Sequence, residues 1–183
     1  RGSGNEAAVL GMFKGWADRR GLPWKQDEVG NLLICIPASP GRENAPTVLI
    51  QGHVDMVCEK NASSSHDFTK DPIVPRVKGE WVVADGTTLG ADNAIGVSLA
   101  LAAAEDPAVA HGPLEILLTV DEERGLTGAQ KVAEGFFGGR ILINIDSEDD
   151  RAVTISCAGM QETLLDFEAP RSRPAAGSKA LEV

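Results

Sequence analysis

His53 and Asp55 form the first pair in the sequence whose types and spacing could do chemistry, because they follow an apolar run. The run Val48-Leu49-Ile50 predicts a short buried strand, and residues two apart in an extended backbone point to the same side. An imidazole and a carboxylate would then project together from the carboxyl end of the strand, where open α/β sheets bind their ligands. A neutral imidazole is a common metal ligand, and a carboxylate behind it can fix its tautomer. Taken alone, the pair is weak evidence for a metal site and fits better a loop histidine capped by a neighbouring acid.

Three further acidic clusters lie where a predicted strand ends or a predicted helix begins. They are Asp92, before a helix predicted over 94–104; Asp121-Glu122-Glu123, after a strand predicted over 116–120; and Asp146, after a strand predicted over 141–145. Carboxylates gathered at one edge of a sheet repel one another, and a divalent cation is the simplest group that would offset them. Each acid alone would fit an N-cap or a solvated turn. Together with His53, they favour a metal site.

The remaining periodicity predicts the elements that position these residues. An amphipathic helix is expected to begin near Glu6, with Leu10, Phe13 and Trp16 at helical spacing, and to end before Gly21. The other expected elements are strands over 24–26, 31–36 and 153–157 and a helix over 125–134. Alternating strands and helices favour an α/β fold with a mixed, largely parallel sheet and helices on both faces.

These motifs resemble those of the co-catalytic zinc peptidases, the family that includes carboxypeptidase G2 and the tripeptidases. The segments that carry the resemblance are Gly52-His53-Val54-Asp55-Met56-Val57, Thr87–Asn93, Glu122-Glu123 and Ile145-Asp146-Ser147. Within that group the chain is most similar to the aminoacylhistidine (Xaa-His) dipeptidases. The narrower resemblance rests on His66–Pro72, Gly79–Trp81 and His111–Glu115. The resemblance covers nearly the whole chain, and its motifs occur in the family's order.

The resemblance implies a domain organisation. Residues 1–158 would form the first half of the zinc-peptidase catalytic domain, and residues 159–183 would begin a smaller α+β lid domain. The Pro-, Arg- and Ala-rich residues 170–177 resemble the passage into that lid. By the same resemblance the chain is an N-terminal fragment, and the complete protein would be a homodimer joined through the lid.

The resemblance also implies a set of metal ligands. Asp92 would bridge two divalent metal ions, most simply zinc, with cobalt or manganese as alternatives. His53 and Asp146 would complete the protein ligands of one ion, and Glu123 would bind the other. The family's remaining ligand is a histidine far downstream, which His66 and His111 do not match. The family has a cis peptide bond after the bridging aspartate, so the Asp92–Asn93 bond is expected to be cis.

Two acids would then carry the chemistry. Glu122 matches the family's general base, which takes a proton from the metal-bridging water, and Asp55 matches the residue that orients the histidine. The implied reaction is metal-dependent hydrolysis of the peptide bond of small dipeptides, of the aminoacyl-histidine class. The 183-residue piece itself is expected to be weakly active or inactive. Asp121 is expected to be a solvated surface residue.

Composition excludes some classes of partner. The formal net charge of −10 argues against nucleic acid and anionic membranes, both of which need a basic face. No apolar stretch reaches bilayer length, and no signal-peptide pattern is present. The three cysteines, Cys35, Cys58 and Cys157, are widely spaced and odd in number, which indicates reduced thiols and a cytoplasmic location. Cys35 lies in an apolar run and is expected to be a small core residue.

Three alternatives remain open. A related amidohydrolase, such as a tripeptidase, a carboxypeptidase or an N-acyl amino acid deacylase, would use the same metals. A catalytically silent metal-binding module would lack the base, whereas Glu122 is present. A plain acidic α/β domain would bind no metal above a non-specific background.

Overall fold

The computed structural model describes residues 1–147, 149, 151–156, 159, 163–168, 173 and 176–179. The chain divides into two units, residues 1–150 and 151–183, and the helices and strands named below all belong to the first. The predicted boundary at residue 158 and the predicted lid over 159–183 stay predictions, and much of the passage over 170–177 falls outside the described residues. Among the described residues, no helix combines the length and the apolar character needed to cross a bilayer.

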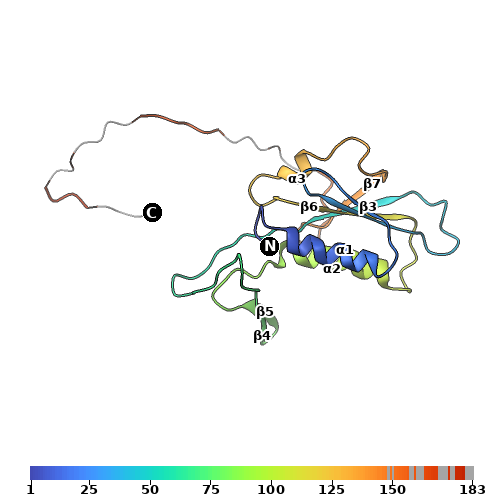
Figure 1. Ribbon diagram of the computed structural model, residues 1–183, viewed down its shortest axis with the longest axis horizontal. Helices are drawn as coiled ribbons and strands as arrows, with labels where there is room; N and C mark the ends of the chain where they lie inside the picture. Colours follow the sequence, from blue (N-terminus) through green and yellow to red (C-terminus); the bar gives the residue numbers. More distant parts are fainter. Residues whose placement is uncertain are drawn as a thin grey trace. The chain divides into compact units, whose positions relative to one another are not determined.

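A five-stranded mixed sheet forms the frame of the first unit (Figure 1). Its order is β1 (Trp24–Gln26), β2 (Leu32–Ile36), β6 (Leu114–Thr119), β3 (Val48–His53) and β7 (Ile141–Asn144). β1 pairs with β2, and β2 with β6, in antiparallel fashion; β6, β3 and β7 run parallel. His53 is the last residue of β3, and the predicted acids follow the ends of β6 and β7. The parallel part of the predicted mixed sheet therefore brings the candidate residues to one edge.

Two helices cover one face of the sheet, and a short helix with its following loop covers the other (Figure 1). On the first face lie α1 (Ala7–Asp18) and α2 (Ala91–Glu105). Asp92 and Asn93 have non-helical backbone angles inside the first turn of α2, so its regular part begins at Ala94, as the sequence predicts. On the second face lie α3 (Thr127–Gln130) and the segment that continues to Phe137.

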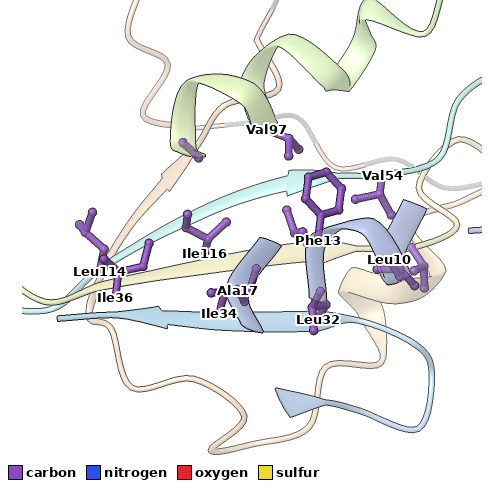
Figure 2. Close-up of a cluster of buried hydrophobic side chains, with 13 residues drawn as sticks. Leu10, Phe13, Ala17, Leu32, Ile34, Ile36, Val54, Val97, Leu114 and Ile116 are labelled. Atoms are coloured by element: carbon purple, nitrogen blue, oxygen red, sulfur yellow. The ribbon is translucent and has the colours of Figure 1, made fainter. Parts of the chain in front are cut away.

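The main core lies between the first face and the two long helices. Leu10 and Phe13 of α1 and Val97 of α2 pack in one cluster with Ile34 and Ile116 of the sheet (Figure 2). On the opposite face a smaller cluster is formed by Leu33, Leu49, Leu117 and Phe136, and Cys35 packs against it partly buried. The expectation that Cys35 is a small core residue is thus confirmed.

The helix predicted over 125–134 is wrong in its length, because only Thr127–Gln130 are helical. Leu126, which caps its start, has a left-handed φ of 60°, and Gly125 has a φ of 137°. Gly128 packs so closely on the backbone of Val120 that a side chain would not fit there. This single turn is therefore shaped by its contact with the end of β6, and contact with the sheet overrides the periodicity of the sequence.

The strand predicted over 153–157 is also wrong for its described part. Residues 153–156 form no strand, and Cys157 lies outside the described residues. The side chains of Val153 and Ile155 are almost fully exposed. An apolar alternation forms a strand only where a neighbour pairs with it and buries one face, and these residues have neither.

A hairpin that the sequence did not predict joins β4 (Pro75–Lys78) and β5 (Trp81–Ala84). It turns through Gly79, whose φ of 63° lies in the left-handed region. Every residue of β4 is exposed, so the strand lacks the buried face that gives alternating apolar and polar residues. Its signals in the sequence are the glycine in the turn and the short run Trp81-Val82-Val83, whose aromatic and β-branched residues favour a strand.

Gly52 of β3 lies in close contact with α2, just before the candidate histidine. A Cβ at this position would collide with Asn93 Oδ1 and would press on Val97. Gly52→Ala should therefore lower the free energy of unfolding by about 1–3 kcal/mol, as overpacking in a tight core does. Gly11→Ala is a matched control in α1, where a Cβ meets nothing within 4 Å, and should raise stability by about 0.5–1 kcal/mol. Urea unfolding of both variants checks this, and equal effects would contradict the close packing.

Candidate metal centre

His53 lies at the centre of the site, and its side chain is fully buried at the end of β3. Its Nδ1 is 3.2 Å from Asp55 Oδ1, which confirms that the two side chains project to the same side. Its Nε2 is 2.9 Å from Asp92 Oδ1, 3.5 Å from Asp146 Oδ1 and 3.9 Å from Glu122 Oε2. One imidazole therefore has a carboxylate behind it and three in front.

The residues predicted to hold one metal ion come together. Among the described residues, possible ligand atoms of His53, Asp92 and Asp146 all lie within 4.8 Å of one another. A second group with the same spread contains His53, Glu122 and Glu123. One nitrogen and several carboxylate oxygens are a donor set that zinc accepts, so the residues present fit a divalent ion. Within the part of the chain that the structure describes, no such group joins Glu123 to Asp92, and the bridging role of Asp92 stays a prediction.

The site concentrates negative charge around one imidazole. Burial lowers the pKa of His53, but contacts with Asp146, Asp55 and Asp92 outweigh it and raise that pKa to about 11. The contact with His53 holds the pKa of Asp146 below its usual range. Burial raises the pKa of Asp55, but hydrogen bonds from His53, Ser3 and two backbone N–H groups lower it further than burial raises it. Gathered carboxylates need a positive charge beside them, as argued from the sequence. In the absence of a metal ion, the protonated imidazole of His53 would supply part of that charge.

Glu122 differs from its acidic neighbours. Burial raises the pKa of its carboxyl group, and nearby carboxylates add to this, although His53 opposes it. Its side chain is 23% exposed, so it remains open to water. A carboxylate with a raised pKa beside a cluster of ligands has the properties of a proton carrier.

Asp92 lies in the first turn of α2 and contacts Nε2 of His53, whereas Asp55 contacts Nδ1. The Asp92 side chain is 56% exposed, and the Asp92–Asn93 peptide bond is cis, as the family resemblance predicts. The exposed carboxylate leaves room for a ligand beside it.

Asn93 is a residue of the site that the sequence analysis missed. Its Nδ2 donates to the carbonyl oxygen of Ile145 and to Asp146 Oδ1, both at 2.7 Å. The amide therefore links α2 to the segment after β7 and fixes one oxygen of Asp146. The available signal in the sequence was a polar residue directly after Asp92, at the start of an Ala-rich helix. The structure shows that this residue is buried.

Three other polar residues are placed away from the ligand groups. His66 stacks edge-on against Phe68, and His111 Nδ1 lies 2.7 Å from the carbonyl oxygen of Gly112, so both stay outside the centre. The expectation that Asp121 is a solvated surface residue is wrong. Its side chain is only 19% exposed, and its Oδ1 accepts a 2.7 Å hydrogen bond from Arg124 Nε, because the turn after β6 folds back on itself.

Three cavities border the centre. One of about 390 Å³ is lined by Glu123 and Arg124, among others. One of about 620 Å³ is lined by His53, among others, and one of about 530 Å³ by Asp92 and Asp146, among others. Pockets of roughly 300–1,000 Å³ hold small molecules in other proteins. There is thus space for a small ligand on each side of the carboxylates.

No family model matches the chain. The cytosol non-specific dipeptidase of Escherichia coli (strain K12) is 49% identical over 155 residues, which cover 85% of this chain and 32% of the relative. The aminoacylhistidine dipeptidase of Vibrio alginolyticus is 48% identical, with a TM-score of 0.78 over 81% of this chain and 30% of that one. A tripeptidase from Staphylococcus aureus has a TM-score of 0.67 at 24% identity, covers 81% of this chain and 40% of its own, and shows a shared fold alone.

The chain thus spans about a third of the length of the dipeptidases that it resembles, 32% of one and 30% of the other. Within that span, the resemblance inferred from the motifs and the α/β fold are both confirmed.

Proposed function

This chain is a relative of the aminoacylhistidine dipeptidases, and we propose that its site serves metal-dependent hydrolysis of the peptide bond of aminoacyl-histidine dipeptides. The observation that carries the proposal is the group formed by His53, Asp92 and Asp146, with the carboxylate of Glu122 beside it. A ligand set next to an acid that is free to move a proton is the arrangement that amide hydrolysis requires.

His53, Asp92 and Asp146 would hold one divalent ion, and Asp92 with Glu123 would hold a second. Zinc suits this mixture of nitrogen and oxygen donors, and cobalt or manganese are the alternatives. When bound, such ions polarise the scissile carbonyl and make water acidic enough to attack at neutral pH.

The chain's own residues have three tasks in this proposal. Asp55 holds the His53 ring through Nδ1, which leaves Nε2 directed at the other carboxylates. Asn93 fixes Asp146 through its amide. Glu122 takes a proton from the attacking water and delivers it to the leaving amine, for which its raised pKa is suited.

The substrate class and the location are proposed from the size of the cavities, the net charge and the name of one relative. The cavities beside Glu123 and Asp92 have the size for a small peptide, and the strong negative charge disfavours nucleic acid and anionic membranes as partners. The name of the Escherichia coli relative places that protein in the cytosol, and we propose a cytoplasmic location here as well. The homodimer through a lid domain stays a prediction.

A substrate panel separates this function from the related amidohydrolases. The complete product of the gene, reconstituted with zinc, should hydrolyse aminoacyl-histidine dipeptides faster than tripeptides or N-acyl amino acids. Each rate is measured by release of the free amino acid, and chelation should abolish all of them. Faster cleavage of tripeptides or N-acyl amino acids would overturn the assignment to dipeptides, and chelator-resistant hydrolysis would overturn the metal dependence.

A further inference from the structure

The turn after β6 is held by two buried carboxylates from distant parts of the chain. The backbone N–H of Asp121 donates to Glu6 Oε1, and those of Glu122 and Glu123 donate to Asp55 Oδ1 and Oδ2, each at 3.1 Å. Glu6 and Asp55 are both buried. Three consecutive N–H groups of one turn are therefore anchored on two carboxylates, and two of the acids assigned to the centre, Glu122 and Glu123, lie on that turn.

The segment before α1 completes this arrangement. Ser3 Oγ donates to Asp55 Oδ2 at 2.6 Å, and the backbone N–H of Gly4 donates to Glu6 Oε1 at 2.8 Å. Glu6 Oε1 thus joins the start of the chain to Asp121, 115 residues away. A buried carboxylate that accepts several N–H or O–H bonds is stable only with those donors in place, so the segment and the turn hold each other.

We propose that Glu6 and Ser3 are positioning residues, which fix the turn 121–123 and through it the placement of Glu122 and Glu123 relative to His53. Glu6 acts directly on the turn. Ser3 acts through Asp55, which accepts the N–H groups of the turn and also contacts the His53 ring. The assignment rests on the proposed function, because that function makes Glu122 and Glu123 the groups to be positioned.

A third acidic group, formed by Glu6, Asp55 and Asp121, has ligand atoms within 4.8 Å of one another. This group differs from the candidate ligand groups around His53, because each of its carboxylates already has a hydrogen-bond donor within the chain. Glu6 Oε1 and both oxygens of Asp55 accept N–H or O–H bonds, and Asp121 Oδ1 is paired with Arg124. Donors within the chain already offset its charge, so the group holds the turn and is not a metal site.

Two measurements on the complete gene product test the assignment. Hydrogen exchange of the metal-free protein reports on the amides of the 121–123 turn, and calorimetric titration with Zn²⁺ reports on the ligands. Glu6→Ala should speed exchange in that turn and weaken zinc binding about 10- to 100-fold, the usual effect of removing a group that orients a ligand. Glu6→Gln should restore both, because its amide oxygen can still accept the two N–H bonds.

Glu43→Ala is the matched control. Glu43 also accepts the N–H of a glycine two residues before it, at 2.9 Å, but it does so in an exposed loop away from the centre. This variant should leave exchange in the turn and zinc affinity unchanged. If Glu6→Ala fails to fold, Ser3→Ala provides the same test, because it removes only one donor to Asp55.

The outcomes are distinct. Faster exchange and weaker zinc binding in Glu6→Ala, both restored in Glu6→Gln, support the assignment. Faster exchange in Glu6→Ala with unchanged zinc affinity would show a merely structural role and overturn the assignment. An equal loss of zinc affinity in Glu6→Ala and Glu6→Gln would also overturn it. If the unaltered protein binds no zinc, the proposed function falls and this assignment falls with it; zinc binding that is insensitive to Glu6 and Ser3 overturns this assignment alone.

Discussion

Glu122→Gln should lower the turnover of aminoacyl-histidine hydrolysis by about 10²–10⁴-fold while leaving the bound metal unchanged, because an amide cannot carry the proton. Glu122 lies beside the ligand group, with Oε2 at 3.9 Å from His53 Nε2, and its side chain keeps access to water. The substitution conserves the shape of the side chain, so the fold and the ligands should persist. The measurement is kcat of the zinc-loaded gene product, together with its metal content.

Asp121→Asn is the control for this prediction. Asp121 is the adjacent acid, but its carboxylate is paired with Arg124 and its backbone N–H is held by Glu6. The amide of asparagine can still accept the hydrogen bond from Arg124, so turnover should stay within about tenfold of normal, against the larger loss expected for a proton carrier. Near-normal turnover in Glu122→Gln would show that another group moves the proton.

Asp92→Ala should abolish tight binding of both metal ions, because the single carboxylate of Asp92 is assigned as a ligand to both. The side chain is 56% exposed but contacts the buried His53 ring at 2.9 Å, so the metal-free protein should lose about 1 kcal/mol of stability and remain folded. Metal content after exhaustive dialysis and thermal unfolding of the metal-free protein give the two quantities.

Asp106→Ala provides the comparison, because Asp106 lies at the opposite end of α2 and its side chain accepts a local N–H from Ala108. It should retain the full metal content. Two tightly bound zinc ions in Asp92→Ala would refute the bridge, and loss of one ion alone would reassign Asp92 to a single metal.

The grouping of the candidate ligands was predictable from the sequence, because most of them lie at or just after the ends of predicted strands. His53 ends a strand, Glu122 and Asp146 each follow one, and the carboxyl ends of neighbouring parallel strands meet at one edge. Asp92 precedes a helix that packs on the same sheet. Strand-then-acid is a pattern that the sequence displays directly, and the family resemblance supplied the roles.

The supporting residues were not predictable, because their contacts join segments far apart. Ser3 lies 52 residues from Asp55, and Glu6 lies 115 residues from Asp121. Nothing in the sequence near either residue indicates its partner. The same holds for the short α3, whose length is set by the contact of Gly128 with Val120. Propensity and periodicity describe neighbours along the chain, whereas these features depend on neighbours in space.

Equilibrium dialysis of the 183-residue chain against Zn²⁺ tests the central claim most directly, with His53→Ala as the reference. His53 supplies the imidazole on which both groups of candidate ligands depend. The account predicts saturable binding by the unaltered chain and loss of that binding in His53→Ala, while other exposed acids contribute the same weak background to both. A binding curve of the unaltered chain that does not saturate, or that coincides with the curve of His53→Ala, would contradict the existence of a metal centre.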